Sequence, residues 1–210
     1  MPIRSWDRGS EDEWRAWLAD GRDFGLLAAN GPEGRGPVLV PTHFLLAGDE
    51  IVLHLAAPNP FWAAIRADPR VTLAVTDDYA FAAGAWRAEP YVPTSYYASV
   101  HFSCTADAVE DPAGKAAILN RQLAHFEPDW PGRTPVTAGQ EPYGGLLSGI
   151  TGLRLAIDRV DAKFKYDDKK PVGQQAGFAD RLAERGTGRD AEARAQLLRR
   201  NARRAGCPLG

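Results

Sequence analysis

Residues 50–75 read as a strand, a turn, a short helix and a second strand, in the sequence EIVLHLAAPNPFWAAIRADPRVTLAV. The apolar runs IVLHLA and VTLAV have the length and composition of buried strands. Between them, the proline of the turn stands where a helix can begin. The turn places His54, Asn59 and Trp62 where a ligand could meet the start of that helix. We therefore take this stretch as the centre of the candidate site.

The rest of the chain supplies further strands joined mostly by hairpins. Strand-like apolar runs cover residues 24–29, 38–46, 96–109 and 150–168, and amphipathic helical patterns cover residues 10–21 and 111–128. Strand–helix–strand units do not repeat along the sequence, and glycine-rich phosphate loops are absent from it, which argues against a doubly wound fold. The pattern predicts a mainly β (α+β) protein, an antiparallel barrel with peripheral helices.

Length and composition fit an ordinary globular protein. The chain has 210 residues and a net charge of −2, so it lacks the basic character of most nucleic-acid binders. No run is long and apolar enough for a membrane span, and the start of the chain does not resemble a secretory signal. Its cysteines, Cys104 and Cys207, have no metal-binding or disulfide spacing, so we expect a cytoplasmic protein. We divide it into a cofactor-binding barrel domain, residues 1–180, and a C-terminal helical tail on the surface, residues 181–210.

The central turn has two interpretations. With Asn59 as the N-cap and Pro60 as the first helical residue, unpaired backbone N–H groups would point outward and favour a phosphate. Alternatively, this is a connecting helix whose Phe61 and Trp62 fill the core. His54 also has two interpretations, a structural histidine in a strand or an axial ligand for a metal.

A second candidate region is the strand that begins at VPTSYYASVH. Its hydroxyl and aromatic side chains suit a planar ligand that forms hydrogen bonds, and the candidate residues are Thr94, Ser95, Tyr96, Tyr97 and His101. The alternating pattern of this strand predicts one polar face and one apolar face. The two tyrosines could equally be ordinary strand aromatics.

A third candidate region is AKFKYDDKKP, where Lys163 and Lys165 share one face of a strand. Two ammonium groups on one face could neutralise a phosphate or a carboxylate. The same charges could also form a solvated rim. Motifs for hydrolytic chemistry, such as a Ser-His-Asp order or HExxH, do not stand out.

Taken together, HLAAPNPFW, YVPTSYYASVHF and GITGLRLAIDRVDAKFKYDDKKP resemble the PaiB-like family, described as FMN-binding negative transcriptional regulators. The residues that match the family's motifs are His54, Asn59, Pro60, Trp62, Val92, Pro93, Thr94, Tyr97, Lys163, Phe164 and Lys165. Ser95 and Tyr96 replace a tryptophan and an asparagine of the family's VPTWNY-type strand. Residues 166–169 replace its LSQN segment. The resemblance covers roughly residues 24–180.

The resemblance implies a flavin-binding split β-barrel, related to the pyridoxamine-phosphate oxidase type. It also implies a homodimer with FMN at the subunit interface and, if the protein is an enzyme, a flavin-dependent oxidoreductase. A second branch of the superfamily resembles piperazate synthase, which uses haem for N–N bond formation, and there His54 would be the axial ligand of haem b. A third possibility is a transcriptional regulator without enzymatic activity, although the sequence has no helix-turn-helix pattern and DNA binding is not expected.

Overall fold

The structure is a computed structural model that describes residues 1–32, 35–87 and 92–206. Cys207 lies outside the described residues. The elements are, in chain order, η1 (Ser5–Asp7), α1 (Glu11–Ala19), β1 (Phe24–Ala29), β2 (Val38–His43), β3 (Leu45–Ala47), β4 (Glu50–Ala56), α2 (Phe61–Ala67), β5 (Arg70–Ala82), η2 (Gly84–Trp86), β6 (Thr94–Val109), α3 (Pro112–Phe126), η3 (Leu146–Gly149), β7 (Ile150–Lys165), α4 (Val172–Arg185) and α5 (Asp190–Ala205).

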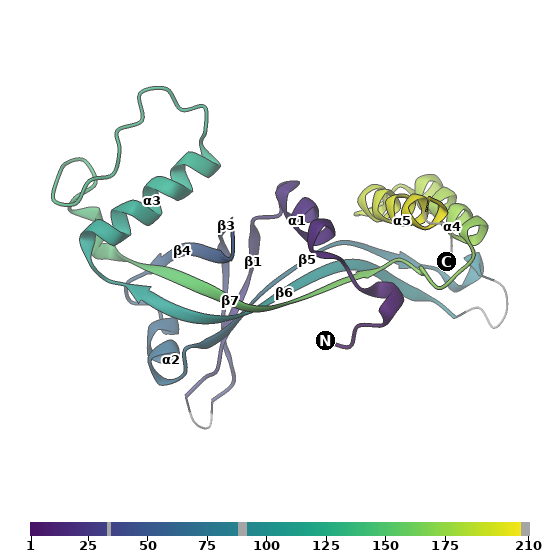
Figure 1. The fold of residues 1–210 in the computed structure, drawn as a ribbon, viewed down its shortest axis with the longest axis horizontal. Coiled ribbons are helices and arrows are strands. Elements are labelled where there is room, and N and C mark those ends of the chain that lie inside the picture. The colour runs from purple at the N-terminus through teal and green to yellow at the C-terminus, as the bar shows by residue number, and fades with distance from the viewer. Residues whose placement is uncertain (33–34, 88–91, 207–210) are drawn as a thin grey trace. The chain divides into compact units, whose positions relative to one another are not determined.

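The strands form one seven-stranded sheet in the order β2-β1-β5-β6-β7-β4-β3. The pairs β1–β2, β1–β5, β3–β4 and β4–β7 are antiparallel. Figure 1 shows the long strands β5, β6 and β7 running next to one another through the sheet. The prediction of a mainly β, antiparallel fold with peripheral helices is confirmed.

The central stretch folds as its sequence predicts, into β4, α2 and β5. The second strand is longer than expected, because β5 continues beyond residue 75, through Asp77 and Asp78, to Ala82. Asp78 has a left-handed backbone, with φ of 56°, and its side chain is fully buried. Its Oδ2 accepts hydrogen bonds from Trp17 Nε1 at 2.8 Å and from Gln196 Nε2 at 3.0 Å. These bonds stabilise a carboxylate inside a strand, which propensity alone would not predict.

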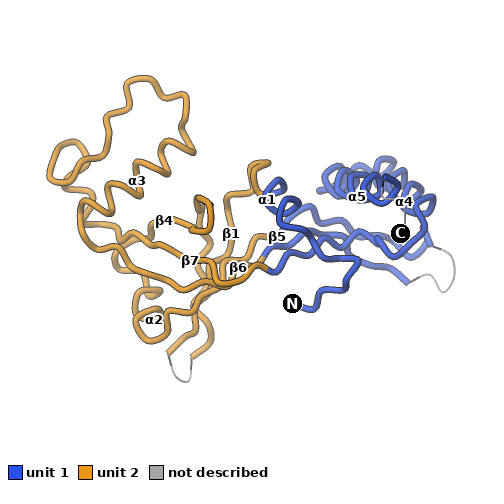
Figure 2. The backbone as a smooth tube through the Cα atoms, in the orientation of Figure 1, with its two compact units in different colours: residues 1–17, 76–100, 161–210 blue, residues 18–75, 101–160 orange. Residues whose placement is uncertain are grey.

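The chain divides into two compact units, coloured separately in Figure 2. Unit 1 contains residues 1–17, 76–100 and 161–210, and unit 2 contains residues 18–75 and 101–160. The strands β5, β6 and β7 each contribute residues to both units. The units therefore differ from the sequence-based division at residue 180.

Unit 2 has its core around α2 and α3. Val52, Val109 and Ile118 form one buried cluster, in which Ile118 belongs to α3. Gly152 of β7 packs closely against this cluster, since a Cβ at this position would lie 2.7 Å from Cδ1 of Ile118. The side chains of Phe61 and Trp62 in α2 are also buried, as the structural interpretation of the central turn predicts.

Unit 1 has its core around α1, α4 and α5. The rings of Trp17 and Phe164 meet edge to face with centroids 5.8 Å apart. Helices α4 and α5 lie side by side (Figure 1), and Leu197 of α5 is fully buried. Arg200 of α5 is also buried and bonds to Glu13 of α1. This differs from the surface tail expected from the sequence, because Arg199, Arg200 and Arg203 of α5 pair with Glu13 of α1.

Candidate functional site

The predicted site residues fall in both units. Unit 2 contains His54, Asn59, Trp62 and His101, whereas unit 1 contains Thr94, Ser95, Tyr96, Tyr97, Lys163 and Lys165. Each group forms its own set of contacts.

In unit 1, the predicted strand and the two lysines meet. Nζ of Lys165 donates a hydrogen bond to Oγ1 of Thr94 at 2.9 Å. The ammonium groups of Lys163 and Lys165 lie 5.6 Å and 5.8 Å from the centroid of the Tyr97 ring, within range of a cation–π interaction. Lys163 is buried and also donates to the carbonyl oxygen of Pro2 at 2.9 Å. Thr94, Tyr97, Lys163 and Lys165 thus form a polar wall that combines a hydroxyl group, an aromatic face and two cations.

The neighbouring residues of that strand differ in role. Tyr96 is fully buried, and its hydroxyl group donates to Oδ2 of Asp167 at 3.0 Å. Burial, together with the charge of Asp167, raises the pKa of Tyr96, so the phenol stays protonated. Asp167 also forms an ion pair with Arg87. Tyr96 therefore supports the polar wall from inside the core, while Ser95 is half-buried.

In the central turn, the start of α2 is already capped. Oδ1 of Asn59 accepts from the N–H of Phe61 at 2.9 Å, and the carbonyl oxygen of Asn59 accepts from the N–H of Trp62 at 3.2 Å. The indole N–H of Trp62 donates to the carbonyl oxygen of Ala56 at 2.9 Å. The outward-pointing N–H groups expected for a phosphate are thus occupied by the turn itself.

His54 of β4 has a defined partner in α3. Its Nδ1 lies 2.7 Å from Oε1 of Gln122, and with the hydrogen on Nδ1 the ring donates a hydrogen bond to this oxygen. Gln122 is buried, and among the described residues its Nε2 has no acceptor. The ring of His43 lies beside His54, with centroids 5.5 Å apart. Burial, with a smaller contribution from His54, lowers the pKa of His43.

His101 lies further along β6 in unit 2, where it is half-buried. The alternation predicted for this strand is present, with Ala98, Val100 and Phe102 fully buried on the opposite face.

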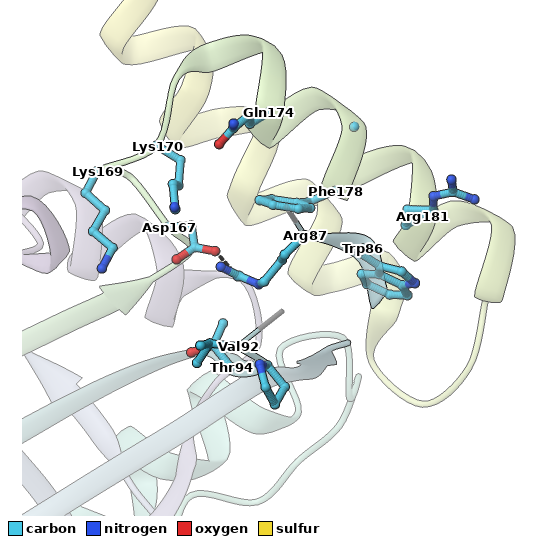
Figure 3. Close-up of a pocket in the computed structure, with 12 residues that line it drawn as sticks. Trp86, Arg87, Val92, Thr94, Asp167, Lys169, Lys170, Gln174, Phe178 and Arg181 are labelled. Carbon is cyan, nitrogen blue, oxygen red and sulfur yellow. Dashed lines mark hydrogen bonds and ion pairs between the residues drawn. The ribbon is translucent and has the colours of Figure 1, made fainter. Parts of the chain in front are cut away.

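Unit 1 also contains an open cavity of about 630 Å³ that sequence reasoning missed (Figure 3). Its lining residues are Trp86, Arg87, Val92, Pro93, Thr94, Asp167, Lys169, Lys170, Gln174, Gly177, Phe178 and Arg181. Thr94 is the one lining residue among the predicted site residues. The segment YDDKK was recognised as charged, but nothing in the sequence showed that α4 would lie over it.

Comparison with known families and structures places this geometry in context. Residues 3–159 match the model of the family described as "Putative FMN-binding domain". The chain belongs to this family. A comparison with curated proteins finds no match.

Three solved structures share the fold. A FAD and haem binding protein from Mycobacterium smegmatis is 21% identical with a TM-score of 0.60, and the match covers 76% of this chain and 73% of that chain. A flavocytochrome from Azotobacter vinelandii is 19% identical with a TM-score of 0.57, and the match covers 78% of this chain and 76% of that chain. A conserved hypothetical protein from Mycobacterium tuberculosis is 22% identical with a TM-score of 0.56, and the match covers 81% of this chain and 94% of that chain. The split-barrel prediction is confirmed, whereas assignment to the PaiB-like branch stays a prediction.

Among the described residues, no group of three or more His, Cys, Asp or Glu side chains could hold a metal ion. In the same part of the chain, no helix has the length and apolar character needed to cross a membrane.

Proposed function

We propose that the protein binds FMN at the polar wall of unit 1 and acts as a cytoplasmic flavin-dependent redox protein. The observation that carries the proposal is the contact between Thr94, Tyr97 and Lys165 in a chain of the FMN-binding domain family. A hydroxyl group, an aromatic face and ammonium groups are the donor set that a planar, phosphorylated and hydrogen-bonding cofactor needs. The residues present therefore fit FMN.

The residues of the polar wall would have different roles in binding the cofactor. Bound FMN supplies hydride or electron transfer, for which the protein needs to give orientation and electrostatics. Lys165, held by Thr94, places a positive charge beside the site, where it favours an anionic group. Tyr97 offers an aromatic surface against which a planar ring can lie. We assign the phosphate to the lysines rather than to the start of α2, since the N–H groups of that turn are already bonded.

A titration of the protein with FMN, followed by flavin fluorescence and absorption, tests the proposal. Thr94→Val removes a hydroxyl group and is expected to weaken binding up to about tenfold, the value of one hydrogen bond. Thr105→Val is the matched control, because Thr105 is also on β6 and donates to Asp158 Oδ2 at 3.0 Å, outside the wall. Absence of flavin bands in the purified protein, together with no binding on titration, would refute the proposal.

We further propose that the protein is a homodimer, supported by an exposed apolar face on β1 and β2. Phe24, Leu26 and Leu39 are 62%, 39% and 53% exposed. Leu26 pairs with Pro41 and Ala28 with Leu39, so these residues lie on one face of the two strands. A second copy that covers this face would remove apolar surface from water. Sedimentation of the wild type and of Leu39→Glu tests this, and a monomeric wild type would contradict it.

Haem binding through His54 is the second candidate function. It is favoured by the hydrogen bond to Gln122, because a ligating histidine usually donates its other ring N–H to a fixed acceptor. Two of the structurally similar proteins are described as binding haem or as a flavocytochrome. A Soret band that is present after haem reconstitution and absent in His54→Ala would support this function. A colourless protein after reconstitution would refute it.

A role as a transcriptional regulator has less support, since basic side chains of α5 form ion pairs within unit 1. Arg199 and Arg200 bond to Glu13 at 2.6 Å and 2.7 Å, and Arg203 lies 3.4 Å from the same carboxylate. These arginines are therefore not available as a set for phosphates of DNA. Retention of the protein on DNA at moderate salt would contradict this assignment.

A further inference from the structure

The cavity of unit 1 is built in part from a segment that the family model does not cover. Its walls come from η2, the start of β6, the residues after β7, and α4. Gln174, Gly177, Phe178 and Arg181 are spaced so that they share one face of α4, which faces the cavity. Residues 167–181 lie beyond the matched residues 3–159. The cavity is therefore a property of this chain rather than of the matched region of the family.

The charges available in this cavity are positive. The carboxylate of Asp167 forms an ion pair with Arg87 and accepts a hydrogen bond from the hydroxyl group of Tyr96. In contrast, no described residue forms a hydrogen bond or an ion pair with the ammonium groups of Lys169 and Lys170. Figure 3 shows both lysines beside the cavity, in the segment that leads into α4.

A buried donor also lines the cavity without a partner. Nε of Arg87 is inaccessible to water, and among the described residues it has no acceptor. Buried N–H groups without acceptors are uncommon in folded proteins, so each one requires an explanation. Arg87 lies with its guanidinium carbon 4.9 Å from the centroid of the Phe178 ring. Its Nη2 is paired with Asp167, so the free positive charge that the cavity offers to an anion is that of the two lysines.

The lining also includes two aromatic side chains and leaves room along α4. Trp86 and Phe178 both contribute to it, and the guanidinium carbon of Arg185 lies 4.7 Å from the centroid of the Trp86 ring. A Cβ placed on Gly177 would have no atom within 4 Å. The cavity thus combines two aromatic side chains, of which Trp86 is the more exposed, with two cations, over a volume of about 630 Å³ that can hold a small organic molecule.

We propose that this cavity binds a small aromatic anion, with its phosphate or carboxylate group held by Lys169 and Lys170 and its ring against Trp86 and Phe178. The proposal does not rest on flavin binding. Of the residues of the polar wall it uses only Thr94, which belongs to the polar wall and also lines the cavity. It predicts a second ligand that binds together with FMN.

Calorimetric titration with 1-naphthyl phosphate, and separately with 1-naphthoate, tests the proposal and distinguishes phosphate from carboxylate. We expect one of the two to bind at low salt with a stoichiometry of one. Lys169→Gln/Lys170→Gln should weaken this binding at least tenfold, since both ammonium groups are lost. Arg4→Gln/Arg8→Gln removes the same charge from exposed positions of unit 1 and should leave binding unchanged.

A second pair of variants tests the location without changing charge. Gly177→Phe places a ring in the open space along α4 and should abolish binding, whereas Gly173→Phe adds the same ring to the same helix outside the cavity lining. Both sites have open space around them, so neither change crowds the core.

Three results would overturn the proposal. The first is that neither naphthyl compound binds the wild type. The second is that the arginine and lysine double variants weaken binding equally, which would show a general charge effect. The third is that FMN displaces the naphthyl compound, which would mean that the cavity is the site of the flavin itself. FMN affinity is measured on its own, so a failure of this proposal is distinguishable from a failure of the flavin proposal.

Discussion

Replacement of Arg200 by methionine should be among the most destabilising single changes in unit 1. Arg200 donates from Nη1 to Oε1 of Glu13 at 2.7 Å, from Nε to Asp168, and from Nη2 to the carbonyl oxygen of Trp6 at 2.9 Å. The side chains of Arg200, Glu13 and Asp168 are 8%, 4% and 5% exposed. One buried cation thus bridges two buried carboxylates.

The size of the effect follows from what remains after the change. Glu13 keeps Arg199, which donates at 2.6 Å. Among the described residues, Asp168 keeps only a side-chain hydrogen bond from Gln175, at 3.4 Å. Burial already raises the pKa of Asp168 with Arg200 in place. Loss of one partner from a buried ion pair costs about 3–5 kcal/mol, so we expect Arg200→Met to lower the free energy of unfolding by that amount.

Urea unfolding followed by tryptophan fluorescence measures this, because Trp14 and Trp17 are buried in unit 1. The control is Arg199→Met, whose side chain is 33% exposed, so its ion pair should contribute about 1 kcal/mol or less. Addition of Asp168→Asn to Arg200→Met should recover part of the loss by removing the unpaired charge. If Arg200→Met costs no more than Arg199→Met, the assignment of Arg200 as the bridging group is wrong.

Three further predictions concern pH and packing. Burial pushes the pKa of Glu13 upward, but the charges of Arg200 and Arg199 outweigh it and hold the pKa below its ordinary value of 4.5. The contribution of the Glu13 carboxylate to stability is therefore complete above pH 4.5 and is lost as the pH falls through the lowered pKa. Glu13→Gln should accordingly make the urea midpoint less dependent on pH on the acid side. Burial, with His54 nearby, lowers the pKa of His43 below 6.5. The contribution of the neutral His43 ring to stability is therefore complete above pH 6.5 and is lost as the pH falls through the lowered pKa. His43→Phe should accordingly reduce the difference in urea midpoint between pH 7 and pH 5. Gly152→Ala should lower the melting temperature, since its Cβ would meet Ile118 at 2.7 Å, and an equal effect of Gly145→Ala, which has open space, would contradict this reading.

Local periodicity was sufficient to predict much of the fold. The helix α2 and its flanking strands occur where the apolar pattern of residues 50–75 places them. The alternation of β6 is also present, except that Ser99 is buried where a polar face was expected. The exception has a physical cause, because Oγ of Ser99 lies 2.7 Å from Oγ1 of Thr76 and the two hydroxyl groups satisfy each other.

The candidate site was predictable only in part, because it depends on contacts between distant segments. Lys165 and Thr94 were both named from local patterns, and the structure brings them together. Arg87 was not named, since it occurs in a turn-rich segment and its partner Asp167 follows 80 residues later. The arginines of α5 suggested a solvated surface, since a charge pattern does not show which acidic group will meet it.

The distribution of unit 1 along the chain has a consequence for biosynthesis. Unit 2 is complete at residue 160, whereas unit 1 needs residues 161–210 as well as residues 1–17. Glu13 meets Arg200 across 187 positions of sequence. On the ribosome, where chains emerge N-terminus first, unit 2 can fold while α4 and α5 have yet to be made. The carboxylate of Glu13 must stay hydrated until α5 has been made, so unit 1 closes later than unit 2 can fold.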